Sequence, residues 1–146
     1  EEALSCNDNE MYDLTGTTGT LRYMAPEVAL DLPYGLKADV HSLGLIMHES
    51  LSLTKPYIFV QPKNFIQEVM VEGFRPSIDF NWPTAVKELI SSMWSSDSAK
   101  RPSSKKVVET LGALLRGHDN DLYPSKGSWR KSIEAKFMQS PVEQAR

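Results

Sequence analysis

Apolar residues recur at helical spacing in the second half of the chain, and this periodicity constrains the fold more than any other feature. An amphipathic helix is predicted over residues 84–95, directly after Pro83. Its apolar side chains have the spacing i, i+3, i+4, i+7 and are Val86, Leu89, Ile90 and Met93, with Trp94 extending the face. A second pattern predicts a helix over 104–116, with Ser103 as its N-cap and Gly117 at its C′ position. The expected buried stripe of this last helix is Val107, Val108, Leu111, Leu114 and Leu115.

Two further helices are predicted earlier in the chain. Residues 36–52 carry apolar side chains on more than one face, which is typical of a helix that is buried nearly all round. A shorter helix is predicted at about 62–72, with Pro62 in its first turn, Gly73 after its end, and a stripe formed by Phe65, Ile66, Val69 and Met70. No stretch alternates convincingly enough to predict a strand, so the fold class is mainly α.

The composition changes at both ends of this helical part. Residues 1–20 are polar, acidic and free of Lys and Arg, which predicts a mobile loop. Residues 117–146 show weak periodicity, so we expect a flexible tail with a short helix at about 130–138. The predicted organisation is therefore a loop over 1–20, a helical subdomain over 21–116 and a tail over 117–146.

Bulk properties exclude several functional classes. The formal net charge of −3 does not favour nucleic acid as a partner, and no apolar run reaches membrane-spanning length. The single cysteine, Cys6, excludes an internal disulfide and fits a reducing compartment, so we expect a cytoplasmic location. Because the chain does not begin with Met, we expect it to be part of a longer protein.

Three motifs, in a fixed order, point to a family. The run Gly19-Thr20-Leu21-Arg22-Tyr23-Met24-Ala25-Pro26-Glu27 is followed by Lys37-Ala38-Asp39-Val40-His41-Ser42-Leu43-Gly44, and later by Lys100-Arg101-Pro102. Over residues 5–116 this order resembles the end of the activation segment and the later C-lobe of a eukaryotic protein kinase. The spacing of Trp94, Asp97 and Arg101 is similar to that in tyrosine kinase-like Ser/Thr kinases.

The resemblance implies a helical C-lobe portion of a kinase fold without the N-lobe and catalytic loop. It implies a parent protein that transfers the γ-phosphate of ATP to Ser or Thr of protein substrates, with ATP and Mg²⁺ as its cofactors. No glycine-rich nucleotide loop, His-Arg-Asp or Asp-Phe-Gly precedes Thr20, so we expect this chain alone to bind no cofactor and to be inactive. Its partners would be protein substrates and the missing parts of the kinase.

Two alternatives remain at this point. A pseudokinase would keep Ala-Pro-Glu and Arg101 for folding and act as a binding or scaffolding domain. An unrelated helical interaction module would require all three motif matches to be coincidence.

The resemblance also assigns structural roles to Glu27, Arg101 and Asp39, and the position of Gly44 inside a helix gives it a further structural role. Glu27 of Ala-Pro-Glu would form a buried ion pair with Arg101, in which a guanidinium meets a carboxylate through two parallel hydrogen bonds. Asp39 would brace the backbone of the catalytic loop; from position alone, it is a first-turn acid that favours the helix dipole. Gly44 lies inside a predicted helix, where glycine costs about 1 kcal/mol against alanine, so close packing of another element is expected there.

Substrate contacts are implied for Thr20, Leu21, Arg22 and Tyr23, which would line the site for the residue after the phosphoacceptor, and Gly19-Thr20 with Tyr23 favours Ser/Thr specificity. Candidate phosphorylation sites are the hydroxyl residues just before this run, Tyr12, Thr15, Thr17 and Thr18. His41 and His48 are seven residues apart, but without cysteine or carboxylate at metal spacing we interpret them as packed side chains. No catalytic and no metal-binding residue is predicted in this chain.

Overall fold

The computed structural model describes residues 21–116, and every regular element in that range is helical. Residues 1–20 and 117–146, with Cys6, Thr20, the four candidate phosphorylation sites, Trp129 and the predicted helix at 130–138, lie outside the described part. In chain order the elements are η1 (Leu21–Tyr23), α1 (Pro26–Ala29), α2 (Lys37–Ser52), η2 (Pro62–Asn64), η3 (Ile66–Val71), α3 (Thr84–Met93), η4 (Ser98–Lys100) and α4 (Ser104–Arg116). Among these residues no helix is suited in length and hydropathy to cross a membrane.

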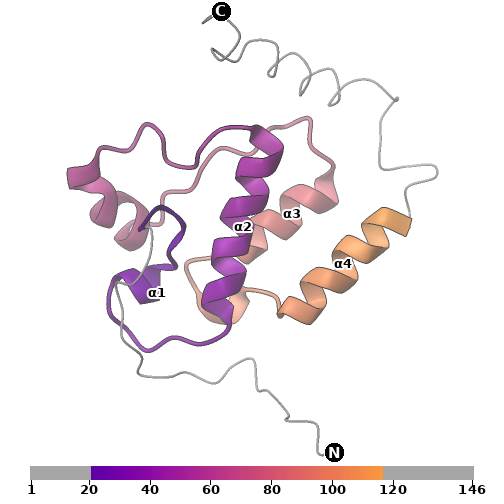
Figure 1. The fold of residues 1–146 in the computed structure, drawn as a ribbon, viewed down its shortest axis with the longest axis horizontal. Helices are drawn as coiled ribbons and strands as arrows, with labels where there is room; N and C mark the ends of the chain where they lie inside the picture. The colour runs from indigo at the N-terminus through magenta and orange to yellow at the C-terminus, as the bar shows by residue number, and fades with distance from the viewer. Residues whose placement is uncertain (1–20, 117–146) are drawn as a thin grey trace, which may run out of the picture.

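Helix α2 occupies the centre of the molecule, with η1 and α1 on one side and α3 on the other (Figure 1). Its bounds agree with the prediction for 36–52, and Leu53 ends it with φ 54°, in the left-handed region. Gly44 is where α3 comes closest: a Cβ built on Gly44 would lie 2.9 Å from Met93 Cβ. The predicted close packing at this glycine is therefore present.

Two apolar clusters flank α2. The larger contains Leu45 and Ile90, both fully buried, together with Met24, Tyr57, Phe65, Val69, Met70, Trp82 and Trp94. The smaller joins α2, α3 and α4 through Val40, Leu89, Met93 and Val107. Ser103 caps α4 as predicted, because its Oγ accepts a hydrogen bond from the backbone N–H of Lys106 at 3.1 Å.

The helix predicted at 62–72 is not one α-helix. Pro62 opens a 3₁₀ turn, η2, and the chain then widens into the π-helical turn η3, where the N–H of Glu72 bonds to the carbonyl of Gln67. The wider turn allows the neighbouring residues Val69 and Met70 both to be buried, while Ile66 is exposed. Gly73, with φ 76°, ends the segment as predicted.

The burial predicted for two helices was too extensive. On α2, Leu43 and Ile46 remain 40% and 50% exposed, because the described residues cover only the opposite faces of the helix. On α4, Val107 is buried, but Val108 and Leu115 are exposed because only the Val107 side of the helix meets the smaller cluster. Apolar periodicity predicted α2 and α4 correctly but overestimated how much of their surface is buried.

Candidate functional site

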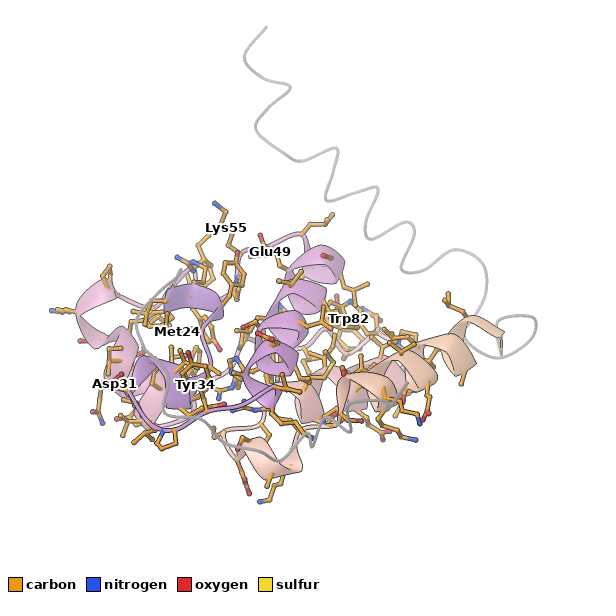
Figure 2. The ribbon with its side chains drawn as sticks, turned by 60° about the horizontal axis from the view of Figure 1, so that its bottom comes forward. Met24, Asp31, Tyr34, Glu49, Lys55 and Trp82 are labelled. Carbon is orange, nitrogen blue, oxygen red and sulfur yellow. The ribbon has the colours of Figure 1, made fainter. Side chains whose placement is uncertain are left out.

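The short turn η1 is fastened to the rest of the molecule by three side-chain hydrogen bonds. Arg22 Nη1 donates to the backbone carbonyl of Pro56. The Tyr23 hydroxyl donates to Glu49 Oε2 at 2.5 Å, and Ser42 Oγ donates to the backbone carbonyl of Tyr23 at 2.8 Å. Ser42 and Glu49 both come from α2, so the turn lies along that helix, while its first residue, Leu21, keeps 37% of its surface exposed. Figure 2 labels Glu49 on α2 and Met24, which continues from the turn into the core.

The bond between Tyr23 and Glu49 changes the acidity of the phenol. The pKa of Tyr23 is raised, first because only the protonated hydroxyl can donate to the Glu49 carboxylate, and second because of burial. Tyr23 is therefore neutral and serves as a hydrogen-bond donor at physiological pH.

Glu27, four residues after Tyr23, forms a buried ion pair with Arg101. Arg101 Nη1 lies 2.5 Å from Glu27 Oε1, and Nη2 lies 2.8 Å from Oε2, which is the bidentate geometry expected from the sequence. The Arg101 side chain is 0% exposed and that of Glu27 is 11% exposed.

Backbone carbonyls complete the shell around this pair. Arg101 Nε donates to the carbonyl of Ser95 at 2.8 Å, and Nη1 also donates to the carbonyl of Lys37 at 3.0 Å. Lys37 Nζ in turn donates to the carbonyl of Arg101 at 2.7 Å. The first turn of α2, the segment after α3 and helix α1 therefore all meet at one guanidinium.

Asp39 is exposed in the first turn of α2, where its backbone N–H donates to the carbonyl of Leu36 at 3.2 Å and its carboxylate makes no hydrogen bond among the described residues. Its carboxylate lies on the same uncovered side as Leu43 and Ile46. The position is compatible with its predicted bracing role, which stays a prediction.

Both histidines of α2 are buried, at 1% exposure for His41 and 4% for His48. His48 packs edge-on against Trp82 with ring centroids 5.4 Å apart, and its Nε2 lies 2.9 Å from the carbonyl of Ser77. Neither ring nitrogen of His41 makes a hydrogen bond of ordinary geometry. Burial, and then the nearby cations Arg101 and Arg75, lower the pKa of His41 to about 3, so the ring is neutral.

Three contributors to this region were missed from the sequence. Ser42 and Glu49 lie seven residues apart on α2, a spacing that puts them on one face of the helix, and this polar pair was the sequence feature that could have indicated their role. Arg75 donates through Nε to the carbonyl of Trp94 at 2.8 Å and through Nη1 to the carbonyl of Val69 at 2.9 Å. The sequence feature that could have indicated the role of Arg75 is the dipeptide Arg75-Pro76, which has the same two residues as Arg101-Pro102.

The arrangement presents a fixed surface turn. Within residues 21–116 no group of three or more His, Cys, Asp or Glu side chains is placed to hold a metal ion. What the region offers is a positioned turn, Leu21–Tyr23, held by α2 on one side and by the Glu27–Arg101 pair behind it.

The comparisons with known proteins agree with the motifs. The family model for protein tyrosine and serine/threonine kinases matches residues 3–111. The serine/threonine-protein kinase STY46 of Arabidopsis thaliana is 39% identical over 103 residues, which are 70% of this chain and 18% of that protein. The serine/threonine/tyrosine-protein kinase HT1 of Arabidopsis thaliana is 31% identical over 107 residues (73% and 27%).

A third relative comes from an animal. Mitogen-activated protein kinase kinase kinase 7 of Bos taurus is 33% identical over 120 residues, which are 79% of this chain and 21% of that protein. The chain thus spans between about a fifth and a quarter of the length of these relatives. Together with the helical architecture, these matches show that the chain belongs to the protein tyrosine and serine/threonine kinase family and corresponds to part of the kinase C-lobe.

Proposed function

We propose that this chain supplies the substrate-docking turn and its supporting helices to a kinase that transfers the γ-phosphate of ATP to Ser or Thr of protein substrates. The observation that carries the proposal is the anchoring of Leu21–Tyr23: two hydrogen bonds hold it on α2, a third joins it to the carbonyl of Pro56, and the Glu27–Arg101 pair fixes the chain directly behind it. A peptide-docking surface must keep its shape when the substrate leaves, and this many fixed contacts favour that property.

Leu21 is the described side chain best placed to touch a substrate, because it is exposed while its neighbours Arg22 and Tyr23 are tied down. Thr20 precedes it, and its proposed contact with catalytic residues follows from the kinase resemblance alone. The relatives include proteins named for Ser/Thr and for Ser/Thr/Tyr, so the choice of Ser/Thr acceptors rests on the Gly19-Thr20 and Tyr23 pattern.

The test uses the full-length parent kinase with Leu21→Ala, assayed on a peptide library that varies the residue after the phosphoacceptor. We expect kcat/KM to shift its preference at that position, with the KM for ATP unchanged, because the turn does not contact nucleotide. Leu32→Ala is the matched control, since Leu32 is an exposed leucine outside this turn. An unchanged peptide preference would remove Leu21 from the docking surface.

We also propose that the isolated chain is inactive, and that ATP and Mg²⁺ are bound by the parent through residues outside those described. Incubation of the purified chain with labelled ATP and a general protein substrate should give no incorporation. Incorporation that copurifies with the chain and disappears in Thr20→Ala would contradict this.

The scaffolding alternative is separated from the active kinase by the coding sequence before residue 1. His-Arg-Asp, Asn and Asp-Phe-Gly there would support the enzyme, and eroded versions would support a pseudokinase. The cytoplasmic location and the phosphorylation of Tyr12, Thr15, Thr17 or Thr18 also stay predictions; mass spectrometry of the protein from activated cells tests the latter.

A further inference from the structure

A surface pocket of about 700 Å³ lies past the C-terminal end of α2, and the docking turn does not use it. Its walls come from the loop after α2, from η3 and from the segment 74–80 that leads to α3. Lys55, labelled in Figure 2 next to Glu49 and the end of α2, belongs to this wall. The volume is within the range of ordinary ligand sites, about 300–1,000 Å³.

The pocket contains polar groups whose hydrogen bonding is incomplete. Tyr57 is 5% exposed, and its hydroxyl interacts with the Arg75 guanidinium without a hydrogen bond of ordinary geometry. Nδ1 of His48, 4% exposed, is without a partner in the described part of the chain. Both residues line the pocket. A buried polar atom without a partner is costly, so an occupant that donates or accepts a hydrogen bond here would be stabilised.

The backbone conformation of Tyr57 is a second feature that marks this pocket. Its φ is 59°, in the left-handed region that a bulky aromatic residue seldom adopts. Strain of this kind is characteristic of functional positions. The preceding carbonyl, that of Pro56, accepts the hydrogen bond from Arg22, so the pocket wall is directly connected to the docking turn.

Exposed aromatic rings also line this pocket. Phe59 and Phe80 are 94% and 83% exposed, and Phe74 is 51% exposed. Large aromatic side chains in water around a hollow are typical of surfaces that bind an apolar helix or peptide. The occupant should therefore present several apolar side chains.

The lining carries charges of both signs. Its two acids are Glu68 and Asp79, and its two cations are Lys55 and Arg75. Arg75 directs its guanidinium to the carbonyls of Trp94, Val69 and Phe74 and to Ser96 Oγ, so its donors are already used. The two carboxylates can therefore pair with basic side chains that flank the apolar face of an occupant.

This chain contains such a segment after α4. Helical spacing i, i+4, i+8 places Trp129, Ile133 and Phe137 on one face, and Arg130, Lys131 and Lys136 lie between them with Glu134 as the one acid. Residues 117–128 connect it to α4 and span roughly 40 Å when extended. A body of about 100 residues has a radius of gyration of about 13 Å, so this linker can reach any face of it.

We propose that residues 128–138 bind the pocket of the same molecule as an amphipathic helix, with Trp129, Ile133 and Phe137 against Phe59, Phe74 and Phe80. The basic side chains then lie near Glu68 and Asp79. Because Tyr57 follows the Pro56 carbonyl that holds Arg22, the bound tail supports the docking turn from behind. This inference does not depend on the proposed phosphotransfer.

The test is amide hydrogen exchange, read by mass spectrometry, on the full 146-residue chain. Relative to the unmodified chain, Trp129→Ala/Phe137→Ala should speed exchange of residues 57–60 and 74–80 by about threefold or more, because it removes the cover. Ser132→Ala/Gln139→Ala, off the apolar stripe, is the matched control and should leave exchange unchanged. Equal exchange in all three proteins overturns the proposal.

A reciprocal variant examines the other side of the contact. Phe80→Ser removes the ring without adding charge at a side chain that is largely exposed, so the fold should persist, and it should speed exchange of residues 128–138. No change in that segment contradicts the proposal. Protection that is lost on dilution of the unmodified chain also overturns it, because the tail would then be occupying a second copy.

Discussion

Two arginines, each followed by proline, have different hydrogen-bond partners for a guanidinium that is removed from water. Arg101 is fully enclosed and meets a carboxylate, Glu27, through two hydrogen bonds. Arg75 is only partly buried and bonds to three backbone carbonyls and a hydroxyl, and it has no ion pair within residues 21–116. Burial lowers the pKa of Arg75. The Tyr57 hydroxyl and the Glu27 carboxylate act in the opposite direction, and the Arg101 cation adds to the lowering.

The difference shows how much counter-charge a cation needs at each depth. Full enclosure removes water from the guanidinium, so a carboxylate has to replace it. A half-buried guanidinium keeps some solvent, and the dipoles of backbone carbonyls are then sufficient. Arg101 should therefore be far more sensitive to substitution than Arg75.

Arg101→Ala is the largest expected effect, because it leaves the Glu27 carboxylate buried without its partner. We expect a loss of about 3–5 kcal/mol in the free energy of unfolding. Urea denaturation followed by tryptophan fluorescence measures it. Lys100→Ala is the control: that side chain is 76% exposed in a 3.7 Å surface pair with Asp97 and should change stability very little. A melting temperature unchanged by Arg101→Ala would mean that the pair contributes nothing.

Arg75→Ala comes second, because it strands backbone carbonyls rather than a charge. Unsatisfied buried acceptors cost about 1–3 kcal/mol, and part of this is recovered by water at the exposed side. The same denaturation assay applies, with Lys87→Ala as the control, since Lys87 also donates to a carbonyl, that of Phe80, but at an exposed position. If Arg75→Ala lowered the free energy of unfolding as much as Arg101→Ala, carbonyl dipoles and a carboxylate counter-ion would not differ in how they stabilise these two arginines.

His41 gives a pH-dependent effect of intermediate size. Its native pKa of about 3 lies below the ordinary value of 6.5, so between these pH values the unfolded chain binds a proton that the native chain does not. Stability should therefore fall as the pH falls through this window, by about 2 kcal/mol between pH 7 and pH 5. His41→Leu removes this contribution.

The measurement compares urea curves of the unmodified chain and His41→Leu at both pH values. Carboxylates titrate in both proteins, so the difference between their slopes isolates His41. Equal slopes would show that the ring finds a partner for its proton despite the nearby Arg101 and Arg75.

Tyr23→Phe is the smallest effect, because the Tyr23–Glu49 bond is only partly buried and water can replace it. We expect a loss of about 0.5–1.5 kcal/mol in the free energy of unfolding. Calorimetry with Glu49→Gln in parallel should give a similar loss, and Ser50→Ala, on the exposed side of α2, should give almost none. A loss as large as that of Arg101→Ala would place this bond in the same class as the enclosed ion pair.

Helices α2, α3 and α4 were predicted to within about two residues, because apolar spacing reports directly on which side of a helix is buried. The same spacing also predicted burial of Leu43 and Leu115, which are exposed, since the pattern cannot reveal whether anything covers them. Helix α1 was missed because four residues are too few to show a period. The π-turn after Pro62 was missed because it depends on packing of Val69 and Met70.

The candidate site was only partly predictable. Glu27 and Arg101 were paired correctly because their motifs have a known relation in the kinase family. Arg75, Ser42 and the left-handed backbone of Tyr57 could not be anticipated in this way, because their roles arise from contacts between segments distant in sequence. Thr20 lies outside the described residues, so its role is still a prediction.

The Glu27–Arg101 pair also has a consequence for how the protein is made. The two residues are separated by 74 positions. At an elongation rate of about 5–20 residues per second, Arg101 is synthesised on the order of ten seconds after Glu27. During that interval helix α1 has its carboxylate and no counter-ion. On the ribosome, the Glu27 carboxylate of α1 therefore remains unpaired until the segment after α3 has been made, whereas the partners of the turn η1 are already present in α2 and at Pro56.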